Sequence, residues 1–431
     1  MSTPKSEFLK VIQDRGYLHQ CTDWDALDAL AAKQPVTAYV GFDATADSLH
    51  VGHMVQIMLL RRLQQTGHRP IALMGGGTTK VGDPSGKDES RKLLTVEDIN
   101  RNLDSIKQSF QGYLTFGGGR TEAIMVNNAD WLERFSFIEF LRDVGKHVTV
   151  NYMLAKESVR SRLEEREQGI SFTEFTYMLL QAWDFVHLSR AHGCRLQLGG
   201  SDQWGNITAG CELQRKLGGP QLYGMTMPLL LDSSGQKMGK TSSGQRVWLD
   251  PALTTPYAFY QYWHNVSDVD AGRFLKTFSW RPLPEILEII AVHGRDPGKR
   301  LGQRTLAEDL GTWVHGAEAI RRAAAASQVM FGGAVTDLAD ADLEALIGEV
   351  PSTDVPLSRL DAGVPLLDLL VETGLCSSKG DARRKISQGG IYLNQQRVES
   401  ADLVLHPKDR ATESFVLLRS GKKEYRLIRV R

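Results

Sequence analysis

Residues 36–67 read VTAYVGFDATADSLHVGHMVQIMLLRRLQQTG and combine two hydrophobic patterns of different period. The first part, VTAYVGFD (36–43), is a β-branched and aromatic run that predicts a buried strand. From residue 50 the apolar side chains recur at helical spacing, and Gly67 provides the stop signal, so we expect a helix over 50–67. A buried strand that leads into an amphipathic helix is typical of folds with a parallel sheet.

The same alternation continues through the first half of the chain. Further strands are expected at RPIALMGGG (69–77), AIMVNN (123–128), CRLQLGGSD (194–202) and LYGMTMPLLL (222–231), and a helix is expected at 95–110. The mostly helical stretch 131–191 interrupts this series as an insertion. The fold class predicted for this part is therefore α/β, with a Rossmann-like parallel sheet.

The chain of 431 residues is long enough for several domains. We expect a catalytic domain over 1–231, a glycine- and serine-rich loop over 232–250 and an α-helical domain over 251–325. Residues 326–363 are acidic and irregular in pattern and are predicted to be a linker. A compact basic module of α+β type, 364–431, follows.

Composition excludes several classes of protein. Hydrophobic residues make up 42% and charged residues 24%, as in ordinary globular proteins. No apolar run has the roughly 20 residues of a membrane span, and the start lacks a secretory signal pattern. The 4 cysteines show no CxxC pairing, which argues against a zinc site and a disulfide framework and favours a cytoplasmic location.

The net charge of zero conceals an asymmetry. From Cys376 onward there are 13 lysines and arginines against 6 aspartates and glutamates, so the rest of the chain is acidic by the same surplus of 7. A basic C-terminal module suggests contact with a polyanion, although a solvated charged surface would have the same composition.

The motif HVGH (50–53) lies directly after a strand and a loop, where the helix is expected to begin. Its two histidines share a helix face and have three interpretations: metal ligands, structural histidines or donors to an anion. The position at the start of a helix favours the third interpretation, binding of an anion, because unpaired N–H groups and the helix dipole attract phosphate there. Gly52 would let a ring or ribose lie close to the backbone.

A second basic cluster is DSSGQKMGKTSSG (232–244), whose composition predicts a mobile loop. Lys237 and Lys240 on such a loop could close over a polyphosphate; an exposed linker is the alternative. The loop is not a Walker A motif, because Ser234 replaces the required first glycine, and a GxGxxG search at Gly75 fails at Lys80.

HVGH and KMGKT, in this order, resemble the paired signature motifs of the class I aminoacyl-tRNA synthetases. HxGH alone would also fit nucleotidyltransferases that form small-molecule adenylates, but these have no use for a basic tail. An RNA-binding regulator would keep the basic tail but would not need the pocket that Tyr177, Gln181 and Asp184 suggest. Four longer stretches, YVGFDATADSLHVGH, VGDPSGKDESR, FTYMLLQAWDF and QLGGSDQWGNI, resemble the bacterial tyrosyl-tRNA synthetase family.

One helix pattern supports this resemblance independently. Tyr177, Gln181 and Asp184 recur at i, i+4 and i+7 on one face of an otherwise apolar helix. Such a polar trio faces a cavity or pairs internally, because unpaired burial costs stability. Tryptophanyl-tRNA synthetases share the fold and are the nearest alternative family, but they would not need Tyr39 and Asp184 as a pair.

The resemblance implies an enzyme that activates L-tyrosine with ATP, with Mg²⁺ carried by ATP and no protein-bound metal, and then transfers tyrosine to the 3′ end of tRNA(Tyr). The implied tyrosine-binding residues are Tyr39, Asp83, Tyr177, Gln181, Asp184 and Gln203. The implied catalytic residues are His50, His53, Lys87, Arg91, Lys237, Lys240 and Thr241. ATP contacts are implied for Gly41, Asp43, Gly52, Gly200, Asp202 and Lys240.

The resemblance also implies partners and larger features. It places 251–325 on the anticodon side, implies a homodimer through the 131–191 insertion, and assigns tRNA contacts to Lys379, Arg383, Arg384 and Lys385. Four positions depart from the family pattern and put local nucleotide contacts in doubt: Val40, Gln56, Thr79 and Lys80.

Overall fold

The computed structural model describes residues 3–85, 94–110, 112–164, 170–241, 244–333, 335, 338–421 and 424–431. The chain divides into two compact units. The first comprises Met1–Asp250 with Gly272–Leu287, and the second comprises Pro251–Ala271 with Glu288–Arg431. Residues 272–287 of the predicted helical domain therefore belong to the first unit.

The first unit is built on a six-stranded sheet of order β1-β6-β5-β2-β3-β4. All neighbouring strands are parallel except for β1, which pairs antiparallel with β6 at one edge. The α/β class and all five predicted strands are confirmed; the short β1 was not predicted. The strands are β1 (Gln20–Cys21), β2 (Thr37–Phe42), β3 (Arg69–Met74), β4 (Ile124–Asn127), β5 (Cys194–Gly200) and β6 (Tyr223–Met227).

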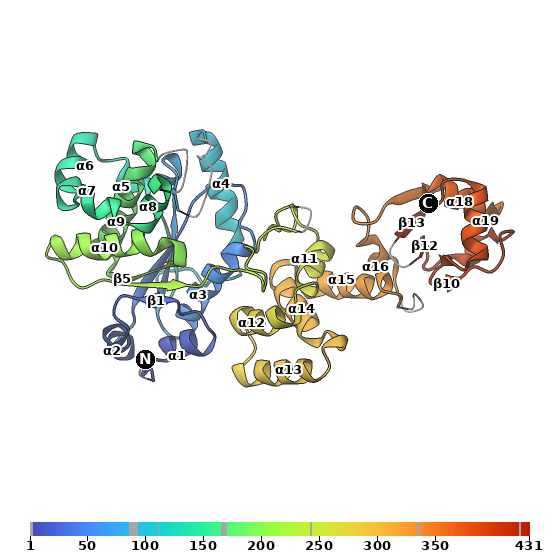
Figure 1. The fold of residues 1–431 in the computed structure, drawn as a ribbon, viewed down its shortest axis with the longest axis horizontal. Coiled ribbons are helices and arrows are strands. Elements are labelled where there is room, and N and C mark those ends of the chain that lie inside the picture. The colour runs from blue at the N-terminus through green and yellow to red at the C-terminus, as the bar shows by residue number, and fades with distance from the viewer. Residues whose placement is uncertain are drawn as a thin grey trace. The chain divides into compact units, whose positions relative to one another are not determined.

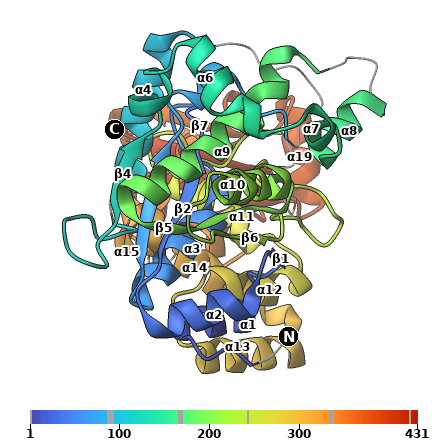
Figure 2. The ribbon, with the colours of Figure 1, turned by 90° about the vertical axis from the view of Figure 1, so that its left-hand side faces the viewer.

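Helices cover both faces of this sheet. The helices α9 (Phe172–His192) and α10 (Trp204–Lys216) lie on one face and α3 (Met54–Gln65) on the other (Figures 1 and 2). Alternate residues of each strand point to opposite faces, so Tyr39, Ile71 and Leu73 pack with Phe185 and Leu188 of α9 in one buried cluster. The sheet core thereby fixes how α9 lies across the strands.

Short helices and turns complete the first unit. Residues 272–287 are attached to it by Arg15 and Arg62, which donate to the Ser279 carbonyl at 2.8 and 2.6 Å. The helices are α1 (Glu7–Asp14), α2 (Trp24–Lys33), α4 (Val96–Ser109), α5 (Ala129–Leu132), α6 (Phe137–Asp143), α7 (Val150–Leu154) and α8 (Glu157–Glu164). Short 3₁₀ turns are η1 (Val51–His53), η2 (Thr78–Lys80), η3 (Gly145–His147) and η4 (Ser201–Gln203).

The second unit begins with helices and ends in a small five-stranded sheet of order β10-β9-β12-β13-β7, beside a pair of short strands, β11-β8. The helices α12 (Asp268–Phe278) and α13 (Leu283–Arg295) each run from one unit into the other. The remaining helices are α11 (Pro256–His264), α14 (Leu301–His315), α15 (Ala317–Met330), α16 (Asp340–Glu344), α17 (Leu357–Asp361), α18 (Leu366–Glu372) and α19 (Lys379–Ser387). The strands are β7 (Ser352–Val355), β8 (Val364–Pro365), β9 (Ile391–Leu393), β10 (Gln396–Arg397), β11 (Val404–Leu405), β12 (Phe415–Ser420) and β13 (Glu424–Val430), and the 3₁₀ turns are η5 (Pro297–Lys299) and η6 (Pro407–Asp409).

The segment 326–363, predicted to be a linker, is structured. Its strand β7 pairs in parallel with β13, and Leu343, Leu346 and Val350 are buried in one cluster with Phe415 and Leu427. These buried residues were not recognised in the sequence, because they lie on short elements among acidic residues and their apolar side chains give no periodic signal. Among the described helices, none is long and apolar enough to cross a bilayer.

Candidate active site at the carboxyl ends of the parallel strands

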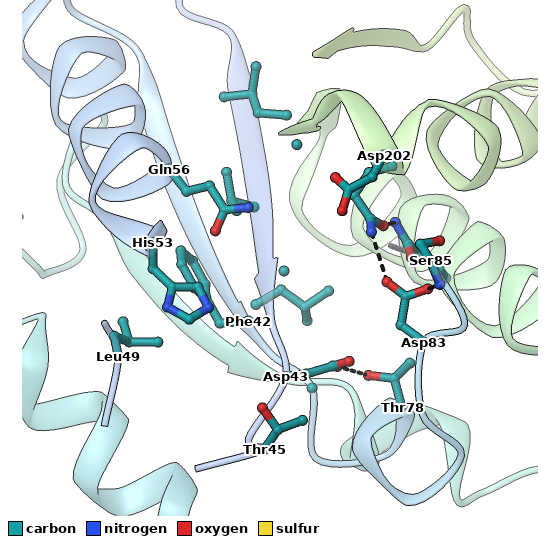
Figure 3. Close-up of a pocket in the computed structure, with 18 of the residues that line it drawn as sticks. Phe42, Asp43, Thr45, Leu49, His53, Gln56, Thr78, Asp83, Ser85 and Asp202 are labelled. Atoms are coloured by element: carbon teal, nitrogen blue, oxygen red, sulfur yellow. Dashed lines mark hydrogen bonds between the residues drawn. The ribbon is translucent and has the colours of Figure 1, made fainter. Parts of the chain in front are cut away.

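The sheet order places a crevice between β2 and β5. The chain leaves β2 toward β3 and β4 on one side and later returns to β5 and β6 on the other, and ligands of open α/β sheets bind at such a reversal. A cavity of about 300 Å³ opens there. His53 and Gln56 lie on one side of the view and Asp83, Ser85, Asp202 and Thr78 on the other, with Asp43 between them and hydrogen-bonded to Thr78 (Figure 3).

HVGH lies at this cavity, at the start of the helical segment formed by η1 and α3. His50 Nδ1 accepts a hydrogen bond from Gly52 N at 3.0 Å, and His53 Nδ1 accepts one from His50 N at 3.2 Å. A ring nitrogen that accepts carries no proton, so this geometry assigns the proton of each neutral imidazole to Nε2. Both histidines can then donate from Nε2.

The KMGKT loop lies against HVGH. The segment after the loop is joined to HVGH through Val51 N to Val247 O (3.0 Å) and Leu249 N to Leu49 O (2.8 Å). At Gly239, whose φ is 134°, an added Cβ would lie 3.4 Å from His50 Nδ1. The two signature motifs, far apart in sequence, are therefore backbone neighbours.

The loop residues do not all reach the cavity. Lys237 lines it, whereas Lys240 is exposed and lies outside the lining. Thr241 closes the turn of the loop, since its N donates to Gln245 O at 2.7 Å and its Oγ1 accepts from Gln245 N at 3.2 Å. Lys240 would need movement of the loop to meet a ligand in the cavity.

Asp184 is 1% exposed at the inner end of the cavity. Its carboxylate accepts hydrogen bonds from Trp131 Nε1 at 2.8 Å and from Asn128 Nδ2 at 2.9 Å. Burial raises the pKa of Asp184 to about 7, even though these two donors act to lower it. The carboxyl is therefore poised between its two protonation states near neutral pH.

Tyr39 is fully buried beside Asp184 and also lines the cavity. Its hydroxyl has no hydrogen-bond partner among the described residues, and burial together with the nearby Asp184 charge raises its pKa well above the ordinary value. A buried hydroxyl without a partner is costly, so a ligand atom that accepts from Tyr39 would relieve that cost.

The polar trio of α9 pairs with other elements rather than internally. Tyr177 donates to Asp43 Oδ2 at 3.3 Å, and Gln181 donates to Gln203 Oε1 at 3.3 Å. Gln203 in turn donates to Asp83 Oδ2 at 2.8 Å. All six residues predicted to bind tyrosine line the same cavity.

Four of the six residues predicted to contact ATP, Gly41, Asp43, Gly200 and Asp202, lie at the ends of β2 and β5, whereas Gly52 lies in η1 and Lys240 lies on the loop. Asp43 and Asp202 line the cavity, and burial raises the pKa of Asp202, with the Asp83 charge adding to the effect. Gly41 also lines it, and a Cβ there would meet nothing within 4 Å. At Gly52 and Gly200 a neighbouring side chain leaves no room for a larger residue. An added Cβ would lie 2.7 Å from the His50 ring at Gly52 and 2.6 Å from Asp202 Oδ1 at Gly200.

Two predicted catalytic residues, Lys87 and Arg91, lie outside the described residues. Of the four departures from the family pattern, Val40 and Gln56 line the cavity, and Gln56 Oε1 is buried with no partner in the part of the chain that the structure describes. Thr79 accepts from Ala44 N at 2.9 Å, and Lys80 pairs with Glu133 at 2.6 Å; neither lines the cavity. Those two substitutions therefore act on local structure.

Sequence reasoning missed the support beneath Asp43 and Asp184. Thr78 Oγ1 donates to Asp43 Oδ1 and accepts from Asn128 Nδ2, each at 3.0 Å, and Asn128 also donates to Asp184. One chain of hydrogen bonds thus joins the two carboxylates. The signal was present in AIMVNN, because polar residues that end a parallel strand lie at the same sheet edge as the other strand ends.

In the second unit, most of the predicted tRNA-binding cations have acidic partners. Arg384 and Lys385 pair with Asp381 at 2.7 and 3.5 Å, and Lys379 pairs with Asp368. Arg383 is exposed on the same helix, α19. Within the described ranges no three His, Cys, Asp or Glu side chains are grouped as a metal site; the absence of a protein-bound metal stays a prediction.

Comparison with family models and with known proteins identifies the chain. Residues 31–332 match the model described as tRNA synthetases class I (W and Y). The chain belongs to this family. Residues 342–428 match a second model, the tyrosine–tRNA ligase SYY-like C-terminal domain.

Relatives match along the whole length. A tyrosine–tRNA ligase of Rhodospirillum rubrum is 50% identical over 430 residues, which cover 100% of this chain and 99% of the relative. One of Nitrobacter winogradskyi is 48% identical over 426 residues, 99% of each chain. The similarity of this class I synthetase to these relatives therefore extends over nearly the whole of each chain.

Solved structures agree on the fold. A C-terminally truncated mitochondrial tyrosyl-tRNA synthetase of Aspergillus nidulans superposes with a TM-score of 0.68 at 30% identity, covering 76% of this chain and 94% of that one. A tryptophan-bound tryptophanyl-tRNA synthetase of Encephalitozoon cuniculi gives 0.54 at 15% identity, covering 78% and 90%. The fold alone therefore does not separate tyrosine from tryptophan.

Proposed function

We propose that this class I synthetase is a tyrosine–tRNA ligase, which activates L-tyrosine with ATP and then transfers it to the 3′ end of tRNA(Tyr). The observation that carries the choice of amino acid is the Tyr39–Asp184 pair at the inner end of the cavity. The full-length relatives and the matched C-terminal domain support the same activity.

Hydrogen-bond chemistry at this pair favours a phenol. A tyrosine hydroxyl can donate to the Asp184 carboxylate and accept from the Tyr39 hydroxyl at the same time. An indole N–H can donate but cannot accept, and phenylalanine can do neither, so each leaves at least one buried polar group unpaired. The substrate's ammonium group is then close to Asp83, Tyr177 and Gln181.

The reaction proceeds in two steps. The tyrosine carboxylate attacks the α-phosphorus of ATP in line, the bond to the β-phosphate oxygen breaks, and pyrophosphate leaves. A ribose hydroxyl of the terminal tRNA nucleotide then attacks the carbonyl carbon of tyrosyl-adenylate, and AMP leaves. Catalysis is positioning and charge stabilisation, for which we assign His50, His53 and Lys237 at the cavity and Lys240 and Thr241 on the loop.

Mg²⁺ enters this proposal as part of the substrate. The ion is bound through the ATP phosphates, since Mg²⁺ keeps most of its ligands as water and phosphate oxygen at nucleotide sites. Asp43, Asp202 and Gly41 are assigned to the adenosine side of ATP, where they line the cavity at the ends of β2 and β5. Cytoplasmic location remains a prediction from the sequence.

A homodimer is proposed on a surface of the first unit. Large apolar side chains stand exposed on helices α6, α7 and α9: Phe137 (64%), Ile138 (69%), Val150 (59%) and Phe172 (66%). Concentrated exposed apolar groups mark interaction surfaces in globular proteins. They lie in or beside the segment 131–191 that the sequence predicts to mediate dimer formation.

Tyrosine-dependent exchange of radioactive pyrophosphate into ATP tests the proposed activity. The full chain should exchange pyrophosphate with tyrosine and should do so far less with phenylalanine or tryptophan. Exchange that tryptophan supports as well as tyrosine would refute the assignment, and so would the lack of exchange with any amino acid.

A further inference from the structure

The cavity that would bind ATP is lined by more carboxylates than cations, even when the lysine that KMGKT contributes is included. Four aspartates line it: Asp43, Asp83, Asp184 and Asp202. Two lysine or arginine side chains among the described residues line it as well, Lys237 and Arg246. A triphosphate must enter against this carboxylate charge, so every cation on its path contributes to binding.

Arg246 lies outside the KMGKT motif, yet the backbone holds it beside both signature motifs. It pairs with Lys240 across an antiparallel bridge at the base of the loop, and the next residue, Val247, donates to Gly239 O at 3.0 Å. Val247 O accepts from Val51 N of HVGH at 3.0 Å. The position of Arg246 is therefore fixed by the segment that connects the loop to the histidines.

The Arg246 side chain is exposed and reaches the cavity from its outer end. Its guanidinium lies 5.5 Å from the centre of the Trp248 ring, and that ring lies 6.2 Å from the His50 ring. Among the described residues no carboxylate forms an ion pair with it, and a guanidinium next to an aromatic face keeps its N–H groups available at its edge.

Depth in the cavity decides which part of a ligand Arg246 meets. Tyr39 and Asp184 are 0% and 1% exposed and form the inner end. An amino acid held there points its carboxylate outward, toward the α-phosphate that it attacks. The β- and γ-phosphates then lie farther out, where the lining includes the exposed Lys237 and Arg246.

We propose that Arg246 binds the β- and γ-phosphates of ATP and stabilises the charge on the departing pyrophosphate. This role rests on the proposed function and adds a residue that neither signature motif contains. The planar guanidinium can donate two parallel N–H groups to phosphate oxygens, which suits the role better than a single ammonium group would. Arg246 takes part in no bond change.

The test compares two nucleotides that differ only in their outer phosphates. Binding of ATP and of AMP to the full chain is measured by calorimetry for the wild type and for Arg246→Gln. The ATP dissociation constant should rise about tenfold, as for a lost hydrogen bond to a charged group, while the AMP constant stays unchanged. Arg246→Lys should recover part of the ATP affinity.

The matched control is Arg120→Gln, because Arg120 is an exposed arginine of the same unit that does not line the cavity. Its ATP and AMP constants should equal those of the wild type. An unchanged ATP constant in Arg246→Gln would overturn the proposal, and so would an equal loss of ATP and AMP, which would assign Arg246 to the adenosine side. The proposed function is tested by a different measurement. A wild type that does not exchange pyrophosphate with tyrosine overturns the proposed function, whereas the comparison of ATP and AMP binding still decides the role of Arg246.

Discussion

Asp184 and Tyr39 are both buried, but they stand in opposite states before a ligand arrives. The Asp184 carboxylate already accepts from Trp131 and Asn128, whereas the Tyr39 hydroxyl has no partner. The first group is held rigidly for an incoming donor, and the second is left for an incoming acceptor. A phenolic hydroxyl meets both requirements, so in the proposed function an incomplete hydrogen-bond set at these two residues provides the specificity.

Asp184 makes tyrosine binding sensitive to pH. The ionised carboxylate accepts the phenol O–H far more strongly than the protonated carboxyl does, so protons compete with tyrosine below the pKa of about 7. The dissociation constant of the wild type should therefore rise by about tenfold per unit as pH falls below 7. Isothermal titration between pH 5.5 and 8.5 measures this slope.

Asp184→Asn provides the matched variant for that measurement. Its tyrosine affinity should fall by roughly 10- to 100-fold at pH 8, because a hydrogen bond to a charged acceptor is lost, and should no longer depend on pH. Normal affinity in this variant would refute the specificity argument.

Tyr39→Phe should affect stability and binding in opposite directions. Removing a buried hydroxyl that has no partner should leave the free energy of unfolding unchanged or raise it by about 1 kcal/mol. Tyrosine affinity should fall severalfold, because the phenol oxygen loses a donor. Thermal melting and titration of the same preparation test both; a clear loss of stability would mean that the hydroxyl is already paired in the empty site.

At the scale of elements, a short antiparallel pairing joins the start of the helical segment to the base of the loop. Val51 and Leu49 exchange hydrogen bonds with Val247 and Leu249, and Gly239 lies against His50. This pairing places the loop beside the histidines, with Lys237 of the loop lining the cavity. Lys240 is exposed, so the catalytic role proposed for it requires the loop to close over the cavity.

Lys240→Ala tests loop closure. In a single turnover, formation of tyrosyl-adenylate should slow by about 100-fold, because the ammonium group acts on charge that develops only in the transition state. Tyrosine affinity should barely change, since Lys240 lies outside the cavity lining. An unchanged rate would contradict the catalytic assignment of the loop.

At the scale of the whole molecule, the proposed dimer surface can be tested by sedimentation. The wild type should sediment as a dimer, and Phe137→Asp or Phe172→Asp should shift it toward monomer, because a charge replaces an exposed apolar contact. Val269→Asp is the control: Val269 is 76% exposed but belongs to the second unit. A monomeric wild type would refute the interface.

Binding of tRNA is best tested in the full chain. A deletion of residues 364–431 would leave β7 without its partner strand and would uncover Leu343, Leu346 and Val350. Arg383→Gln instead changes one exposed charge on α19. Its tRNA affinity should fall severalfold with a weaker dependence on salt, while pyrophosphate exchange stays at the wild-type level; unchanged tRNA affinity would exclude α19 as the contact.

Much of the architecture could be predicted, because buried strands and amphipathic helices leave periodic patterns in the sequence. The strands at 36–43 and 194–202 and the helix at 50–67 are examples, and so is the α9 face that carries Tyr177, Gln181 and Asp184. The segment 326–363 could not be predicted, since β7 is stabilised by pairing with β13, about 75 residues later. Non-local pairing leaves no local period.

By itself the sequence determined which chemical groups are available: imidazoles at a helix start, lysines on a glycine-rich loop and one polar helix face. Only the tertiary structure decided which of them meet. The reversal of strand order at β2 and β5 brings Tyr39 and Asp184 into one cavity, Asn128 and Thr78 link the carboxylates, and a backbone pairing carries Arg246 to the cavity's outer end. The physical reason is that side-chain identity is a local property, whereas proximity depends on strand order and on hydrogen bonds between distant segments.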